Sequence, residues 1–389
     1  MEPHLEAFLN GDPLAQFVLI QQPGRFVVAR RVGPDHVQPV HDPLELRRAV
    51  AAQGIPTAQI ATHIAHWKDT TPAFEEPSVI ALPHEPGLAW SRLPFPLPPH
   101  VGPQAWPAWN EFVSRLSDPA FYLAWLGSVF DKGNRSRQIL WLYGDGQDGK
   151  STTFRVLYET LGSCMATVPD VGMGEDAKRF LAFQAYGHRL VVVTDCRNLK
   201  ILRAGIIRNL TSGDLVSVEG KGTNGFTAVT WTKLAVCSND RPDISSGRAD
   251  TSRAVVLRVA ESVSKSDAQW EDRLRREVPA FLSSCLQRYR EVCPGRAEIP
   301  CAQETQQATK DAASESEAET EVIADDLVLV GRGRSCSLGA LRILARQNHR
   351  LSRFECDDLV RWLKVNRGVV QKGTELVGCS LKGGQGKLL

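Results

Sequence analysis

The sequence predicts an α/β fold built around a parallel central sheet, and three observations carry that prediction. Residues 138–143 form an apolar run that ends at Gly144, as expected for a buried strand. A glycine-rich segment follows, and residues 152–161 then place apolar side chains at helical spacing before Gly162 supplies a stop. Two later apolar runs, 189–195 and 233–239, end in polar residues. Strands that alternate with helices favour a sheet covered by helices.

The glycine-rich segment 144–151, GDGQDGKS, fits the phosphate-binding pattern G-x-x-x-x-G-K-[ST]. Glycines allow successive backbone N–H groups to face phosphates, and the helix that begins there adds its positive end. We expect Lys150 to reach the β- and γ-phosphates of ATP and the Ser151 hydroxyl to bind Mg²⁺. The predicted nucleotide-binding residues are Gly144, Asp145, Gly146, Gln147, Asp148, Gly149, Lys150, Ser151 and Thr152.

Polar residues at the ends of the two later runs complete the predicted site. Asp195 ends the first of them, where a carboxylate would hold the Mg²⁺ ion and its water shell. Asn239 ends the second, where its amide could hydrogen-bond the water that attacks the γ-phosphate. Asp and Asn are also common in turns, so each residue could simply begin a loop.

Residues 210–226 alternate in strand fashion on both sides of the segment 220–225, which predicts a hairpin with Lys221 at or near its tip. In most proteins such a lysine is a solvated turn residue. In a ring-shaped motor it would instead face the central channel and contact a phosphate backbone.

Four features in this order resemble superfamily 3 helicases, the ring-forming AAA+ motors of viruses, phages and plasmids, and most of all the phage and plasmid primase–helicase group. They are GDGQDGKS at 144–151, VVVTD at 191–195, LTSGD with the Lys221 hairpin at 210–222, and the segment 233–259. The resemblance covers roughly residues 106–295. It implies an AAA+ ATPase core with ATP and Mg²⁺ at the interfaces of a homo-oligomeric ring of six subunits. It further implies single-stranded DNA in a central channel and movement from 3′ to 5′.

By the same resemblance, Asn239 reports on the γ-phosphate and Arg253 is the arginine finger that each subunit supplies to its neighbour. Arg258 and Arg248 are the alternatives. One departure concerns the acid, because family members often carry two adjacent acids where this chain has Asp195 between Thr194 and Cys196. Either Asp195 both supports the metal and orients the water, or the base comes from elsewhere, with Asp170, Glu175 and Asp176 as sources. The departure bears on the hydrolysis rate rather than on nucleotide binding.

Changes in charge and composition along the chain predict its division into domains and linkers. The basic stretch 327–389 holds twelve Lys or Arg against four Asp or Glu, and two helices followed by a hairpin around 371–374 predict a winged-helix-like domain there. The preceding segment 303–326 holds eight acidic residues and one lysine, which predicts a solvated linker that need not be ordered. The predicted parts are a small N-terminal α/β unit (1–75), a proline-rich connector (76–105), a helical segment (106–136) broken at Asp118-Pro119, the ATPase domain (137–298), the acidic linker (299–326) and the basic domain (327–389).

Overall composition, the N-terminus and the cysteines indicate the class of protein and its cellular compartment. The 389 residues are 42% hydrophobic and 23% charged, as in ordinary globular proteins, and the net charge of +2 does not indicate a partner. The N-terminus is acidic and no apolar run approaches roughly 18 residues, so we expect neither a signal peptide nor a membrane span. Nine scattered cysteines without a CxxC pair favour reduced thiols in a cytoplasm, here that of a bacterial host cell.

These observations favour an ATP-dependent, ring-forming DNA helicase of a phage or mobile element that translocates on single-stranded DNA during replication. The basic domain would bind duplex or origin DNA, or would only stabilise the fold. No acidic cluster with metal-site spacing precedes residue 100, so we expect a separate primase or polymerase. One alternative is a replication initiator or loader that binds origin DNA without processive unwinding. Another is a small-molecule kinase, which would need an arginine-rich lid and have no use for a trans arginine.

Overall fold

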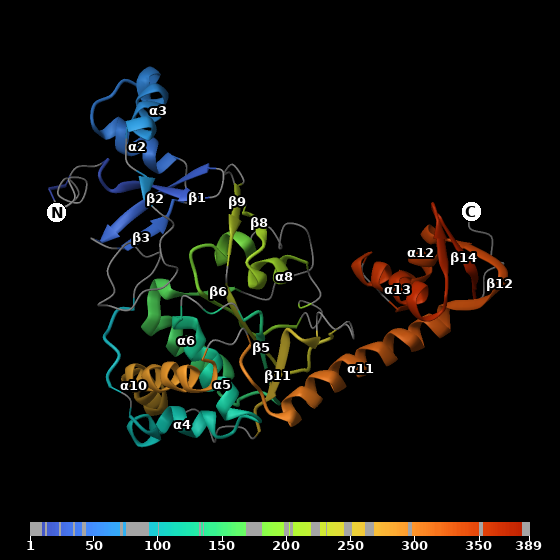
Figure 1. Cartoon of the computed structure of the whole chain (residues 1–389). Helices are drawn as coiled ribbons and strands as arrows, with labels where there is room; N and C mark the ends of the chain where they lie inside the picture. The colour runs from blue at the N-terminus through green and yellow to red at the C-terminus, as the bar shows by residue number, and fades with distance from the viewer. Residues whose placement is uncertain are drawn as a thin grey trace. The chain divides into compact units, whose positions relative to one another are not determined.

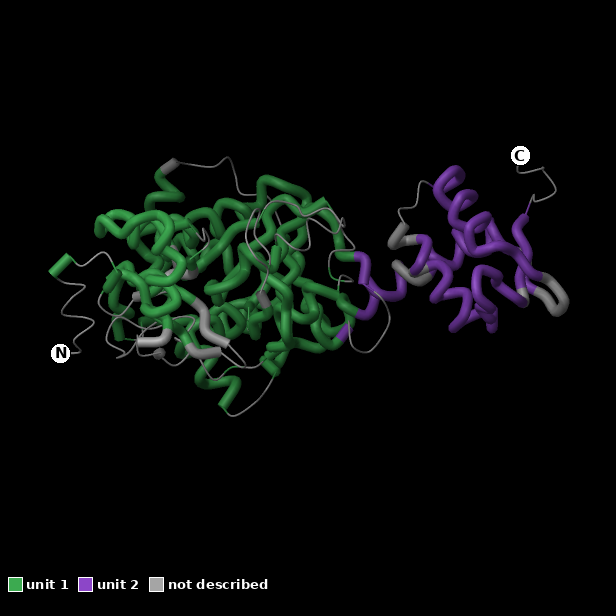
Figure 2. Tube along the Cα trace, turned by 90° about the horizontal axis from the view of Figure 1, so that it is seen from above, with its two compact units in different colours: residues 1–242, 252–309 green, residues 243–251, 310–389 purple. Residues whose placement is uncertain are grey.

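A computed structural model of the chain divides it into two compact units, residues 1–242 with 252–309 and residues 243–251 with 310–389 (Figure 2). The structure describes residues 10–11, 14–22, 25–33, 36–40, 44–70, 73–74, 93–99, 101–131, 134, 136–168, 181–197, 202, 205–218, 226–230, 232–244, 251–260, 268–294, 298–349 and 353–382. None of the helices in these ranges combines the length and the apolar character that crossing a membrane requires.

Among the described residues of the first unit, five parallel strands form a central sheet in the order β11-β5-β10-β7-β6 (Figure 1). The predicted fold class is therefore confirmed. The strands are β5 (Ile139–Tyr143), β6 (Met165–Val168), β7 (Leu190–Val193), β10 (Lys233–Ser238) and β11 (Ala254–Arg258). Because parallel strands end at a common edge, the residues that follow β5, β10 and β7 lie next to one another.

The glycine-rich segment leads from β5 directly into a helix, as predicted. Helix α6 (Lys150–Leu161) ends at Gly162, whose φ of 56° lies in the left-handed region that favours glycine at a helix end. The 3₁₀ turn η4 (Gly162–Cys164) then leads into β6. Farther along, α8 (Gly205–Ser212) precedes the antiparallel hairpin of β8 (Leu215–Val218) and β9 (Phe226–Val229).

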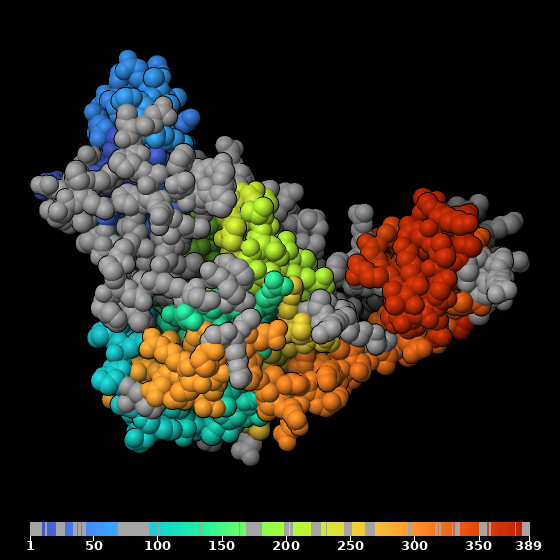
Figure 3. All heavy atoms as spheres, viewed as in Figure 1, coloured from blue at the N-terminus to red at the C-terminus, as the bar shows by residue number. Residues whose placement is uncertain are grey.

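The helical segment before the sheet packs against a long helix that follows it in sequence (Figures 1 and 3). Trp109 stacks on Phe281 with ring centroids 4.1 Å apart, and Gly127 allows the close approach of the backbone at Cys285. The predicted break at Asp118-Pro119 is a helix start, because the Asp118 carboxylate accepts the N–H of Phe121. The elements are η2 (Pro103–Ala105), α4 (Pro107–Val113), α5 (Pro119–Gly127), η3 (Ser128–Phe130) and α10 (Ala268–Val292).

The acidic segment is a continuous helix, α11 (Gln303–Leu327), so the expectation that it need not be ordered is wrong. Its alanines, glutamates and glutamines favour a helix, and Ala312, Ala313, Ala324 and Leu327 are buried. The start of α11 is fixed by Asp118, whose Oδ2 accepts the N–H of Ala302 at 2.7 Å and the hydroxyl of Thr305 at 3.2 Å. Asp118 therefore anchors the N-termini of both α5 and α11.

The basic C-terminal residues form the predicted pair of helices followed by a hairpin. Strand β12, which the sequence did not predict, joins that hairpin in a three-stranded antiparallel sheet, counted over the described residues. Gly373, with a φ of 60°, stands first in the two-residue hairpin turn, where a positive φ is needed. The elements are β12 (Val328–Ser337), α12 (Leu338–His349), α13 (Arg353–Asn366), β13 (Val370–Lys372) and β14 (Glu375–Leu381).

The N-terminal residues form a four-stranded sheet, as far as the structure describes it, in the order β3-β2-β1-β4. Phe17, Leu19, Leu46 and Trp67 form its small core. The elements are β1 (Phe17–Gln22), β2 (Arg25–Gly33), β3 (His36–Pro39), α2 (Leu44–Ala52), η1 (Thr57–Gln59), α3 (Ile60–Thr70) and β4 (Ala73–Phe74).

Candidate nucleotide-binding site

The loop between β5 and α6 has the backbone conformation of an anion-binding site. Gly146, Gln147 and Gly149 all have positive φ angles, of 89°, 53° and 88°. Left-handed residues interspersed in such a loop turn neighbouring backbone N–H groups toward a common point. Lys150, Ser151 and Thr152 begin α6, so the positive end of that helix lies at the same place.

Ser151 and Asp195 meet beside this loop, although 44 residues separate them. The Ser151 hydroxyl donates a hydrogen bond of 3.3 Å to Asp195 Oδ1. Asp195 follows β7 with a φ of 51°, a conformation that aspartate tolerates better than most residues. A hydroxyl and a carboxylate are the hard oxygen donors that Mg²⁺ prefers. The described residues hold no group of three or more His, Cys, Asp or Glu for a metal, and a Mg²⁺ site completed by substrate phosphates needs none. The pair therefore fits the ion.

Hydrogen bonds between the ends of β7 and β10 fix the neighbouring residues. The N–H of Cys196 donates to Cys237 O at 2.8 Å, and the Ser238 hydroxyl donates to Cys196 O at 2.8 Å. Asn239 comes next and faces the loop, since a Cβ built on Gly146 would lie 3.9 Å from Asn239 Oδ1. The Cys237 thiol beneath is neutral, because burial raises its pKa.

Lys150 is buried and held within the loop itself. Its Nζ donates to Gly144 O at 3.2 Å and pairs with the Asp148 carboxylate, while its backbone N–H donates to Asp148 Oδ1 at 3.2 Å. The side chains of both residues are about 95% buried, with exposed fractions of 4% and 5%. The sequence marks Asp148 as one loop residue among several and gives no sign of this pairing.

Arg253 and Arg258 lie at opposite ends of β11. Arg253 precedes the strand, where its carbonyl accepts the N–H of Ile139 at 2.7 Å, and Arg258 pairs in register with Tyr143 at the loop end of β5. The five residues of β11 span about 16 Å, so Arg253 lies at the sheet edge away from its own loop. Arg258 is exposed at the same edge as that loop.

Some predicted residues lie outside the described part of the chain. They are Lys221, Arg248 and the alternative bases Asp170, Glu175 and Asp176. The strands that flank the Lys221 segment are described and pair antiparallel from Leu215↔Val229 to Val218↔Phe226. The predicted hairpin is thus present, and its tip stays a prediction.

Two features near the loop were missed from the sequence. Arg241 donates from Nε to the Tyr143 hydroxyl at 3.3 Å and lies 5.5 Å from the centre of that ring. The indole of Trp141 donates to Asp240 O at 3.0 Å. Both contacts tie the segment after β10 to β5. The only sequence signal for them was the position of Arg241 two residues after Asn239.

A buried polar network fixes the opposite edge of the sheet. Lys233 Nζ donates to Asn134 Oδ1 at 2.6 Å and to Ser136 O at 2.8 Å, and Arg189 donates to Asn134 O at 2.8 Å. Asn134 in turn donates to the Tyr289 hydroxyl at 2.9 Å. Desolvation and, to a smaller extent, the Arg189 charge hold the pKa of Lys233 well below its ordinary value.

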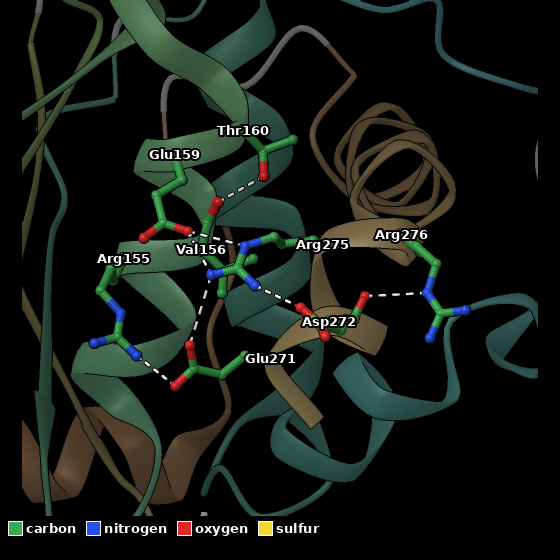
Figure 4. Close-up of polar contacts among 8 residues, drawn as sticks. All are labelled: Arg155, Val156, Glu159, Thr160, Glu271, Asp272, Arg275 and Arg276. Carbon is green, nitrogen blue, oxygen red and sulfur yellow. Dashed lines mark hydrogen bonds and ion pairs between the residues drawn. The ribbon is translucent and has the colours of Figure 1, made fainter. Parts of the chain in front are cut away.

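On the surface, ion pairs connect the loop helix α6 to α10 (Figure 4). Arg275 pairs with Glu159 at 2.8 Å and with Glu271 at 3.6 Å, and Arg155 pairs with Glu271. Exposed pairs of this kind contribute little to stability because solvent screens them, so they orient α6 more than they stabilise it.

Comparisons with known proteins place this geometry in context. A family of unknown function (DUF5906) matches residues 142–253, and no curated protein matches the chain. The A form apo structure of the NrS-1 C-terminal region (305–718) is similar with a TM-score of 0.52 and 12% identity, covering 95% of this chain and 87% of that one. A JCV helicase structure with a bound thiazolopyridine compound has a TM-score of 0.32 and 16% identity, covering 57% of this chain and 62% of that one. The chain therefore shares the fold of the NrS-1 C-terminal region over nearly its whole length.

Proposed function

We propose that the protein is an ATP-dependent, ring-forming DNA helicase of a phage or mobile element that translocates on single-stranded DNA during replication. The observation that carries the proposal is the hydrogen bond between Ser151 and Asp195 beside a loop that holds Lys150. A phosphate loop, a hydroxyl and a strand-end acid in contact are the parts that bind a nucleoside triphosphate with its metal.

Each residue has a defined part in hydrolysis. Lys150 would neutralise the β- and γ-phosphates, and Ser151 with Asp195 would hold Mg²⁺. When bound, the ion supplies positive charge to the phosphoryl oxygens. Asn239 faces the loop from the neighbouring strand and would orient the attacking water. Because Asp195 is the single acid after β7, its carboxylate would both support the metal and orient the attacking water.

The position of Arg253 supports a homo-oligomeric ring, a hexamer by resemblance. Arg253 lies at the sheet edge away from its own loop, so it would act on ATP bound by the next subunit, where an arginine stabilises charge on the transferred phosphoryl group. Opening and closing of that interface would move the Lys221 hairpin along single-stranded DNA in the channel.

The C-terminal winged-helix-like residues would bind duplex or origin DNA. Arg361 and Lys364 on α13 and Lys372 at the hairpin are exposed, and Lys364 contacts Gln371 of the hairpin at 2.6 Å. Basic side chains on adjoining elements suit phosphate contacts. The setting would be the cytoplasm of a bacterial host, with priming by a separate primase or polymerase.

Unwinding of a forked DNA duplex tests the proposal. Wild-type protein with ATP should separate the strands, and Lys150→Ala should not. Forks with only a 3′ or only a 5′ tail would report the polarity. The single acid at Asp195 favours one second candidate, an initiator or loader. Tight binding of duplex DNA with slow ATP turnover and no strand separation would contradict the helicase and support that candidate.

A further inference from the structure

We propose that Asp148 competes with phosphate for the loop: its carboxylate occupies the donors that a nucleotide needs, and ATP binds by displacing it. The inference rests on the proposed nucleotide site, and it concerns the contact that a nucleotide must displace in order to bind there. It makes Asp148 a determinant of nucleotide affinity rather than a residue of the chemical step.

The contacts of Asp148 match those expected of a phosphate. Oδ1 accepts the backbone N–H of Lys150 at the start of α6, and Oδ2 pairs with the Lys150 ammonium. A backbone N–H at a helix N-terminus and the loop lysine are the groups through which this motif binds phosphate oxygens. Asp148 therefore supplies an anion from within the loop to the same donors.

Packing holds the carboxylate in place. A Cβ built on Gly144 would lie 2.4 Å from Asp148 Oδ2, so the carboxylate fills the space that a side chain at position 144 would need. The carbonyl of Gly144 also accepts from Lys150 Nζ at 3.2 Å. Two of the three ammonium donors of Lys150 thus have partners inside the loop before any ligand arrives.

Burial makes this competition strong. Because the side chains of Asp148 and Lys150 are only 5% and 4% exposed, water screens their attraction poorly. A nucleotide must break this pair to reach Lys150. Its apparent affinity is therefore the intrinsic affinity multiplied by the fraction of molecules in which the pair is open. Removing the charge at position 148 should therefore raise nucleotide affinity.

Asp148→Asn is the sharpest variant, because an amide oxygen can still accept the N–H of Lys150 but no longer neutralises the ammonium. Its affinity for Mg²⁺-ATPγS, measured by calorimetry without DNA, should rise about tenfold, as expected for loss of a charge-assisted contact. Asp148→Ser, which also keeps a helix-capping oxygen, should give a similar gain if the amide disturbs the loop.

Asp145→Asn provides the matched comparison, since it removes the same charge from an exposed position of the same loop. Its gain should be clearly smaller. An equal gain in Asp145→Asn would show that the general charge of the loop sets affinity and would overturn the proposal. Unchanged or weaker binding by both Asp148 variants would also overturn it, because Asp148 would then assist the nucleotide.

The measurement separates this inference from the helicase proposal, because it uses neither DNA nor hydrolysis. Tighter binding by Asp148→Asn in a protein that fails to unwind DNA would support the competition and contradict the helicase. Binding by Asp148→Asn where the wild type shows none would support the competition most strongly. If no variant binds ATPγS, both proposals are wrong.

Discussion

The Ser151 hydroxyl donates a hydrogen bond of 3.3 Å to Asp195 Oδ1, joining the first turn of α6 to the end of β7. Strand β10 lies between β5 and β7, so this contact reaches across it and places Asn239 beside the loop. The contact brings together the hydroxyl and the acid that the proposed chemistry requires.

Asp195→Asn should lower ATP hydrolysis at saturating Mg²⁺-ATP about 100-fold, because the amide keeps the shape of the side chain but loses the charge that holds the metal. Binding of ATP should change much less, since Lys150 and the loop remain. Asp240→Asn is the control, an exposed acid that follows the neighbouring strand and contributes its backbone groups to the structure. Near wild-type hydrolysis by Asp195→Asn would place the acid elsewhere.

The Arg253→Ala variant should not hydrolyse ATP on its own. When it is mixed with the Lys150→Ala variant, which is also inactive alone, hydrolysis should be partly restored. In a mixed ring, some interfaces combine an intact loop from one variant with an intact arginine from the other. Hydrolysis by a series of mixing ratios, with rings re-formed after mixing, measures this effect. Arg258→Ala is the comparison, because that arginine lies at the edge of its own loop. No recovery in the Arg253→Ala mixture, with recovery in the Arg258→Ala mixture, would reassign the finger.

Gly127→Ala should destabilise the first unit by about 2 kcal/mol or more, since overpacking forces backbones apart. A Cβ at this position would lie 2.0 Å from the carbonyl oxygen of Cys285, where α5 crosses α10. Gly205→Ala is the matched control, because a Cβ there meets nothing within 4 Å and a helix favours alanine. Urea unfolding measures both variants, and equal midpoints would contradict the close packing of α5 on α10.

The buried amino group of Lys233 predicts that the stability of the protein depends on pH. Its folded pKa is lowered, so between that pKa and its ordinary value of 10.5 the unfolded chain binds a proton that the folded protein does not. The free energy of unfolding should therefore rise with pH in this range. Relative to Lys233→Met, the wild type should gain stability as the pH rises toward 10.5. Lys310→Met, at an exposed position, controls for loss of charge. A constant difference between wild type and Lys233→Met would contradict the shift.

The sequence predicted the features that depend on local pattern. The loop, its flanking strand and helix, and the strands that precede Asp195 and Asn239 follow from apolar spacing and one motif. Helices α12 and α13 follow in the same way. The order of the strands in the sheet could not be predicted from the sequence, because strand pairing across long loops leaves no periodic signal. For the same reason, the sequence did not show that Arg253 and Arg258 lie at opposite edges of the sheet.

The prediction for the segment that forms α11 relied on composition, because its acidic residues suggested a solvated linker. The structure has a helix there, supported by buried alanines and by the Asp118 cap. Pairings between motif residues were also invisible. Asp148 and Lys150 stand two residues apart in the loop, and nothing in the pattern indicates that one neutralises the other. The network of Lys233, Asn134 and Tyr289 joins residues far apart in sequence, which no local pattern encodes.

Steady-state ATP hydrolysis with and without single-stranded DNA tests the central claim most directly. The wild type should hydrolyse ATP, single-stranded DNA should stimulate the rate several-fold, and Lys150→Ala should be inactive under both conditions. A rate that single-stranded DNA leaves unchanged, or one that Lys150→Ala retains, would contradict a nucleotide-driven motor on DNA.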